Sequence, residues 1–161
     1  MSLTLISAFP HVLGLIGADA TAAVVPRLSQ LDPDYVKKYE AALRKADVSK
    51  PGDGPGVIFV LWSKGGDAAN GNGAPQLDLQ NGFLLSVVES TKNNTTGKSA
   101  LEWVSYLLRL LHRGAPQGRQ ATGDIRHPAQ GSVYELGPLG QGLVIYFINL
   151  EVRSTEPLLT V

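Results

Sequence analysis

Apolar residues recur along the chain at two different spacings, and the change between them separates predicted helices from predicted strands. Steps of three and four residues run through the first 17 residues, where Gly14 or Gly17 can end a helix. We therefore predict a short amphipathic helix near the N-terminus. Its expected apolar stripe consists of Leu3, Ile6, Pro10, Leu13 and Ile16.

A second helical pattern covers residues 33–46. Asp32 can cap this helix, and Pro33 suits the first helical position. One face is apolar and the other is rich in lysine and arginine. The charged face can contact phosphate or an acidic partner, but a solvated helix face is the preferred interpretation. The apolar face consists of Tyr35, Tyr39, Ala42, Leu43 and Ala46, and the charged face of Lys37, Lys38, Glu40, Arg44 and Lys45.

The spacing then changes to that of strands. Residues 57–62 form a continuous apolar run, which predicts a strand covered on both faces. Residues 79–90 predict a second strand, with Phe83, Leu85 and Val87 on one face. Between them, residues 64–75 are glycine-rich and polar, so we expect a long protruding loop that connects the two strands as a hairpin.

The clearest helix prediction covers residues 99–113. Ser99 and Glu102 have the spacing of a capping box, and Gly114 follows the last basic residues. The predicted apolar stripe consists of Ala100, Leu101, Val104, Leu107, Leu108 and Leu111.

Two further strands are predicted at residues 132–136 and 143–154 after an irregular polar connection. The even positions of the last strand are all apolar and should face the core. The odd positions Leu143, Ile145 and Phe147 are also apolar, so this half of the strand needs a cover on its second face. A helix of the same chain and a neighbouring subunit are both candidates for that cover.

These elements indicate an α+β fold, in which an antiparallel sheet of about four strands packs against two or three helices in a single domain. The N-terminal helices fall within residues 1–50, the sheet and central helix within 57–154, and a C-terminal tail covers 155–161. A chain of 161 residues with 43% hydrophobic residues is long enough to bury a core of its own. We therefore expect no dependence on a structural metal.

Composition narrows the function classes. The chain has no cysteine, which excludes thiolate catalysis, iron–sulfur clusters and cysteine zinc sites. Its 14 basic and 14 acidic residues balance, so binding to nucleic acid through overall charge is not expected. The apolar N-terminal stretch has no lysine or arginine before Arg27 and contains Asp19, so we predict a core helix and no membrane role.

Candidate chemistry is sparse. Residues 96–99 end like a phosphate-binding loop before a helix, but Lys92 occupies the position of the earlier glycine, and helix capping explains Ser99. His11, His112 and His127 are isolated, and no serine-hydrolase elbow is present. We therefore predict no catalytic residues, no metal ligands and no cofactor, and hence no enzyme. The alternative left open is a small nucleotide-binding enzyme that uses Lys98 and Ser99.

Three segments resemble the tail-terminator, or tail-completion, proteins of long-tailed bacteriophages, most of all those of Mu-like phages. The resemblance covers residues 57–154. The segments that carry it are Ala100-Leu101-Glu102-Trp103-Val104 with Leu107-Leu108, Val133-Tyr134-Glu135-Leu136, and Gly142-Leu143-Val144-Ile145-Tyr146-Phe147-Ile148-Asn149-Leu150-Glu151-Val152-Arg153-Ser154.

The resemblance implies a structural virion protein that forms a hexameric ring on the head-proximal end of the tail tube. Such a ring ends tube polymerisation and joins the tail to the neck. The implied partners are further copies of the chain, the tail tube protein, neck or head–tail connector proteins, and the sheath protein if the tail is contractile. The implied location is the virion tail, assembled in the host cytoplasm, with the ring around the DNA path and no specific nucleic-acid binding.

The family likeness suggests which residues form subunit or tube contacts. The basis is the doubly apolar strand and the polar loop, because a ring subunit needs surfaces for its neighbours. The candidates are Leu143, Ile145, Phe147, Lys64, Asp67, Asn70 and Asn72. Another head–tail joining or neck protein of similar fold is the alternative within the same structural class.

Overall fold

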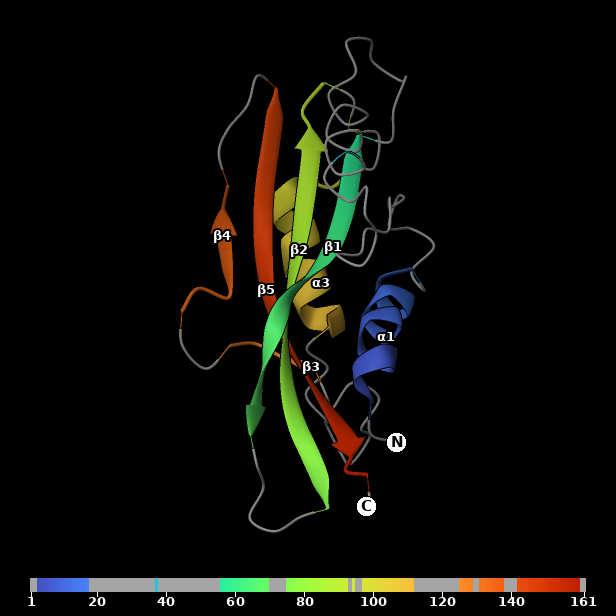
Figure 1. Cartoon of the computed structure of the whole chain (residues 1–161). Helices are drawn as coiled ribbons and strands as arrows, with labels where there is room; N and C mark the ends of the chain where they lie inside the picture. Colours follow the sequence, from blue (N-terminus) through green and yellow to red (C-terminus); the bar gives the residue numbers. More distant parts are fainter. Residues whose placement is uncertain are drawn as a thin grey trace.

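The protein forms a small α+β domain, as the sequence predicts (Figure 1). The structure is a computed structural model that describes residues 3–17, 37, 56–69, 75–92, 94, 97–111, 125–128, 131–137 and 142–159. Within these residues, an antiparallel sheet of five strands packs with two helices. In chain order the elements are α1 (Leu5–Gly17), β1 (Val57–Ala69), β2 (Gln76–Ser90), α3 (Ala100–Leu111), β3 (Ile125–Arg126), β4 (Tyr134–Leu136) and β5 (Leu143–Pro157).

Three long strands form the centre of the sheet. β2 pairs with β1 on one side and with β5 on the other, and the short strands β3 and β4 both pair with the outer side of β5. All these pairings are antiparallel. Figure 1 shows the sheet twisting strongly along its length, with β4 beyond β5 at one margin. Among the described strands, β1 is therefore one lateral edge, and β3 and β4, which pair with different parts of β5, form the other.

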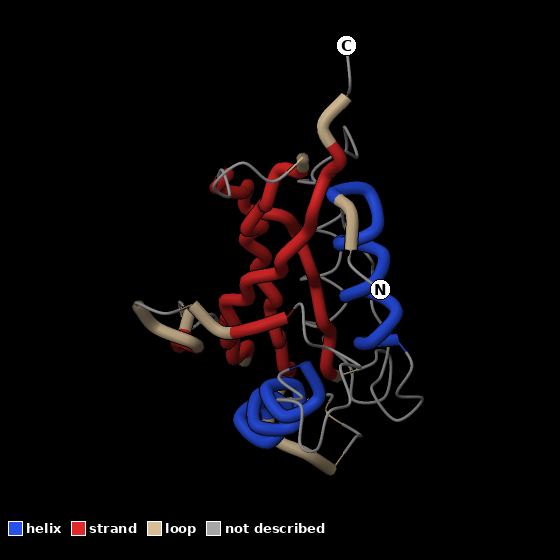
Figure 2. Tube along the Cα trace, turned by 90° about the horizontal axis from the view of Figure 1, so that it is seen from below, coloured by secondary structure: helices blue, strands red, loops and turns tan. Residues whose placement is uncertain are grey.

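The main core lies on the face of the sheet that contacts α1 and α3, which we call the helix face (Figure 2). Phe59 packs edge-on against Trp103 of α3 with ring centroids 5.2 Å apart. Phe83 stacks at 5.7 Å against Phe9 of α1. The even positions of β5 lie on this face as predicted, with Ile148, Leu150 and Val152 buried and Val144 and Tyr146 partly buried.

α3 confirms the predicted capping box. The Ser99 backbone N–H donates to Glu102 Oε2 at 2.7 Å, and the Glu102 N–H donates to Ser99 Oγ at 3.3 Å. The hydrogen bonds from Ser99 and the nearby positive charge of Lys98 lower the pKa of the Glu102 carboxyl. The buried stripe is Ala100, Trp103, Val104, Leu107 and Leu111, whereas Leu101, predicted to be part of it, is exposed.

α1 forms where predicted, but its predicted stripe is only partly right, because Ile16 is buried and Leu3 and Leu13 pack against the core, whereas Ile6 and Pro10 do not. The residues against the sheet are Ala8, Val12 and Ile16, whereas Ile6 is 87% exposed and Pro10 is also exposed. The helix contains no charged residue, so its sequence has no polar face that could fix its rotation. The predicted helix over residues 33–46 lies outside the described residues, except for Lys37, which is helical.

The predicted long loop over residues 64–75 is wrong for its first half. β1 continues to Ala69 with a bulge between Ser63 and Gly65, and β2 begins at Gln76, three residues before the predicted start. Gly65 has φ +113, a backbone conformation that only glycine adopts readily. The extension is possible because main-chain hydrogen bonds to β2 need no particular side chains.

Candidate functional site

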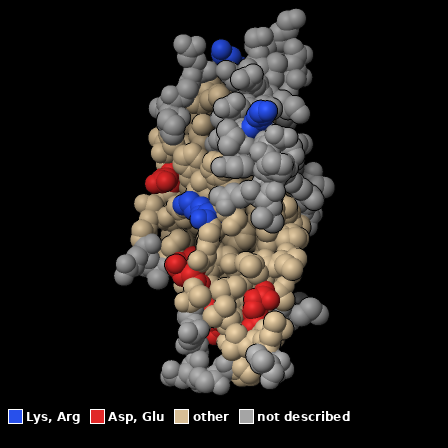
Figure 3. All heavy atoms as spheres, in the orientation of Figure 1, with Lys and Arg blue, Asp and Glu red and all other residues tan. Residues whose placement is uncertain are grey.

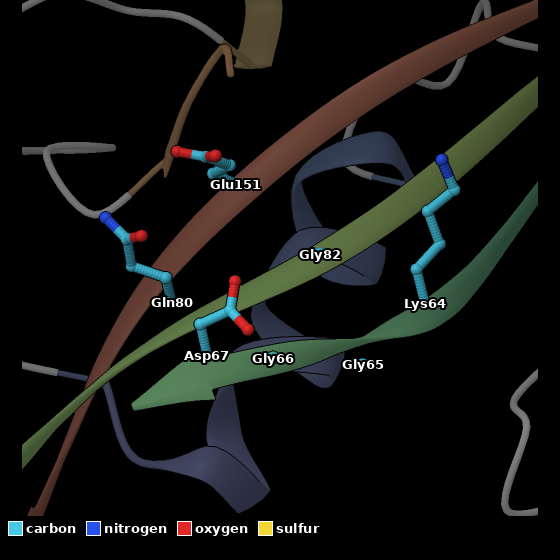
Figure 4. Close-up of a pocket in the computed structure, with 7 residues that line it drawn as sticks. All are labelled: Lys64, Gly65, Gly66, Asp67, Gln80, Gly82 and Glu151. Atoms are coloured by element: carbon cyan, nitrogen blue, oxygen red, sulfur yellow. The ribbon is translucent and has the colours of Figure 1, made fainter. Parts of the chain in front are cut away.

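The extended half of the β1–β2–β5 ribbon holds a polar hollow on the face opposite the helix face, which we call the second face (Figure 4). The hollow has a volume of about 410 Å³ and opens to solvent. Three of the lining residues are glycines, so no side chains fill the hollow from these positions. It is lined by Lys64, Gly65, Gly66, Asp67, Gln80, Gly82 and Glu151.

Lys64 is the extra residue of the β1 bulge and spans the ribbon. Its Nζ donates to Asn149 Oδ1 on β5 at 2.6 Å. The Asn149 amide in turn donates from Nδ2 to the Ser132 carbonyl at 3.0 Å, just before β4. This series of hydrogen bonds ties one lateral edge of the sheet to the other.

The two carboxylates of the hollow differ in their pairing. Glu151 forms an ion pair with Arg126 of β3, with Arg126 Nε 3.1 Å from Glu151 Oε2. Asp67 is exposed, projects from β1 into the hollow (Figure 4), and has no ion-pair partner among the described residues. Figure 3 shows the described charges scattered over the visible surface with no basic or acidic patch.

The predicted interface residues fall into two separate groups on the second face. Lys64 and Asp67 line the hollow, and Asn70 and Asn72 lie outside the described residues. Leu143, Ile145 and Phe147 are at the other end of β5, beside Ile58, Val60 and Val88. The row Trp62, Leu84 and Asn149 separates the two groups.

The apolar group is already packed within the single chain. Ile58, Val60 and Val88 are fully buried, and Ile145 is 8% exposed. Leu143 and Phe147 are half-buried. The Phe147 ring also covers Gly137, because a Cβ at Gly137 would lie only 2.7 Å from Phe147 Cε2. Ile145 is therefore a core position, and of these three residues Leu143 and Phe147 retain surface that a neighbour can contact.

The two residues of the nucleotide-binding alternative have structural contacts. Ser99 Oγ donates to Glu102 Oε2 at 3.1 Å as part of the capping box. Lys98 Nζ lies 4.6 Å from the Trp103 ring centroid and 4.9 Å from that of Tyr106, within the range of cation–π attraction. These contacts favour helix capping over phosphate binding.

β4 is a surface that sequence reasoning missed. Its three residues Tyr134, Glu135 and Leu136 are all exposed, and two of them are large apolar side chains on an edge strand. The alternation of apolar and charged residues predicted a strand here. That pattern by itself gave no sign that the strand lies at an edge, because the neighbours of a strand are set by the whole sheet.

We also searched the described part of the chain for a metal site and for a membrane-spanning helix. It holds no group of three or more histidine, aspartate or glutamate side chains placed to bind a metal ion. Neither α1 nor α3 is long and apolar enough to cross a membrane. Comparison of the sequence with protein-family models and with curated proteins found no match.

Proposed function

We propose that this chain is a tail terminator, a structural virion protein whose copies form a hexameric ring on the head-proximal end of a phage tail tube. The ring ends polymerisation of the tube and joins the tail to the neck proteins. The family likeness of residues 57–154 is the starting point of the proposal, and the predicted α+β fold agrees with it.

One structural observation carries the proposal, namely that the sheet has two different exposed edges. Residues 64–68 of β1 are exposed at one edge, and all three residues of β4 are exposed at the other. Two unlike surfaces on one subunit permit head-to-tail contacts, which build a closed ring when the rotation between copies closes. Exposed strand edges in a soluble protein otherwise invite uncontrolled association.

The proposed contacts involve three parts of the second face and its margins. Lys64 and Asp67 stand beside the β1 edge and serve subunit or tube contacts. Leu143 and Phe147 offer half-buried apolar surface at the opposite end of the ribbon. The tail tube, the neck proteins and, in a contractile tail, the sheath are the remaining partners.

The first test is the mass of the purified chain by light scattering, with negative-stain images of the same sample. We expect annular particles near six times 17.1 kDa, about 103 kDa. The same protein is then added to isolated tail tubes and, separately, to isolated head connectors, with untreated tubes as the control. Tubes that become capped and stop growing support the proposal.

The other outcomes separate the alternatives. Binding to connectors but not to tubes replaces the terminator role by another neck role. A monomer that binds neither tubes nor connectors contradicts both structural roles. Thermal stabilisation by a nucleotide would bring back the enzyme alternative.

A further inference from the structure

The backbone of β1 has free hydrogen-bonding groups at two particular residues. In an antiparallel sheet, alternate residues direct both N–H and C=O to the same neighbouring strand. Ser90 N–H donates to the Gly56 carbonyl, next to β1, and Thr91 N–H donates to the Gly142 carbonyl, next to β5. Because the direction alternates along a strand, even-numbered residues of β2 form their main-chain hydrogen bonds with β1 and odd-numbered residues with β5. Gly82 and Gln80 therefore bond to Gly65 and Asp67, their register partners.

The residues between those partners face outward. Gly66 and Ala68 direct their N–H and C=O groups away from β2, toward the free edge of β1. Both residues are exposed. Their positions opposite Asn81 and Leu79 place them on the helix face of the sheet. This edge therefore offers main-chain donors and acceptors beside very small side chains.

The β4 edge has the complementary arrangement. Asn149 N–H donates to the Val133 carbonyl at 2.9 Å and Gly137 N–H to the Ile145 carbonyl at 2.7 Å, so odd residues of this segment bond to β5. Tyr134 and Leu136 then direct their main-chain groups to the free edge. Their side chains are 47% and 53% exposed and lie on the helix face, opposite Ile148 and Tyr146.

We infer that copies of this chain join edge to edge, with β4 of one copy pairing with residues 64–69 of β1 in the next. Across the sheet the strands β1, β2, β5 and β4 alternate in direction, so β4 and β1 run opposite to each other. A following copy therefore continues the antiparallel alternation. The inference rests on the proposed ring, for which it supplies the contact between subunits.

Side-chain size and charge select the register. Tyr134 pairs with Gly66, where an aromatic ring covers a bare glycine, and Ser132 then pairs with Ala68. A shift by two residues would pair Leu136 with Gly66 and bring Asp67 directly opposite Glu135. Like charges in that position are unfavourable. In the chosen register Asp67 lies opposite Val133, and Glu135 lies opposite Gly65, next to Lys64.

Disulfide trapping tests this contact, because the chain has no cysteine of its own. The variant with both Asp67→Cys and Val133→Cys places two thiols opposite each other across the proposed contact. Within one copy these positions are three strand spacings apart across the sheet, about 14 Å, and are also offset along the strands, which is too far for a disulfide. Mild oxidation should give a ladder of covalent multiples of 17.1 kDa on denaturing gels without reductant.

The matched controls are each single cysteine variant and the pair Asp67→Cys with Glu135→Cys, which reports the shifted register. Dimers are the largest product expected from a single variant. A stronger ladder from the shifted pair overturns the register.

Light scattering of the unmodified chain and the tube-capping assay distinguish this inference from the proposed function. A hexamer, or a capped tube, whose subunits show no ladder overturns the strand pairing and leaves the ring role standing. A ladder from a protein that does not cap tubes supports the strand pairing and contradicts the terminator role. A monomer that gives no ladder and caps no tube overturns both.

Discussion

Two buried serines show how single polar groups act within this sheet. Ser86 is fully buried on the second face, and within the described structure its hydroxyl has no hydrogen-bond partner. Ser154 is buried on the helix face, where its Oγ accepts a hydrogen bond of 2.8 Å from Asn81 Nδ2. A buried hydroxyl without a partner is costly, whereas one that satisfies a buried amide is stabilising.

The two serines should therefore respond in opposite ways to the same substitution. We expect Ser86→Ala to raise the free energy of unfolding by about 1 kcal/mol, because it removes an unsatisfied polar group. Ser154→Ala should lower it by about 1 to 3 kcal/mol, because it takes one acceptor from the Asn81 amide. Urea denaturation of the two variants and the unmodified chain measures both changes, and a loss of stability in Ser86→Ala would contradict the argument.

At the scale of elements, glycines permit a longer β1 than the sequence indicates. Gly65 takes a positive φ at the bulge, and the strand then continues beside β2. At Gly66 an added Cβ would lie 2.8 Å from the Gln80 carbonyl oxygen. The two positions therefore need glycine for different reasons, one for its backbone conformation and one for the close approach of the neighbouring strand.

A pair of glycine substitutions tests the role of the bulge. Gly65→Ala should lower the free energy of unfolding by about 1 to 2 kcal/mol, because its φ disfavours any side chain. The matched control is Gly14→Ala in α1, where no atom lies within 4 Å of the added Cβ and φ is ordinary. That variant should raise stability by about 0.5 to 1 kcal/mol. Thermal melting compares the two, and equal melting temperatures would argue against the strained bulge.

The elements that the sequence predicted well are those in which the pattern of apolar, polar and capping side chains matches which positions are buried. In α3 the capping box and apolar stripe gave both the helix and its orientation. In β5 the even positions identified the core face. β1 beyond Ser63 is held by main-chain pairing of glycine, alanine and aspartate, whose side chains give no strand pattern. α1 has no polar face, so its rotation depends on packing against the sheet.

The candidate site was only partly predictable for the same reason. Lys64 and Asp67 were expected on a loop and instead lie on a strand, where they line the hollow. The exposed edge at β4 depends on which strands neighbour it, and strand order is a property of the whole sheet. Periodicity within three residues contains no information on that order.

At the scale of the whole molecule, an assembly through sheet edges can be blocked without disturbing the fold. Ala68 directs its N–H outward, so proline at this position removes no hydrogen bond within the chain. At concentrations where both proteins are monomeric, we expect Ala68→Pro to keep the melting temperature of the unmodified chain. The affinity between subunits should fall about tenfold or more, because the pyrrolidine ring of the proline blocks the pairing with β4 of the next copy and the backbone N–H donor at this position is lost.

Asp67→Pro is the matched control, since the Asp67 N–H bonds to Gln80 and its loss should lower the melting temperature. Light scattering over a dilution series and thermal melting of both variants separate assembly from folding. If Ala68→Pro formed hexamers as tightly as the unmodified chain, residues 64–69 would not lie in the subunit contact. The ring would then have to close through other surfaces, of which the half-buried Leu143 and Phe147 are the first to test.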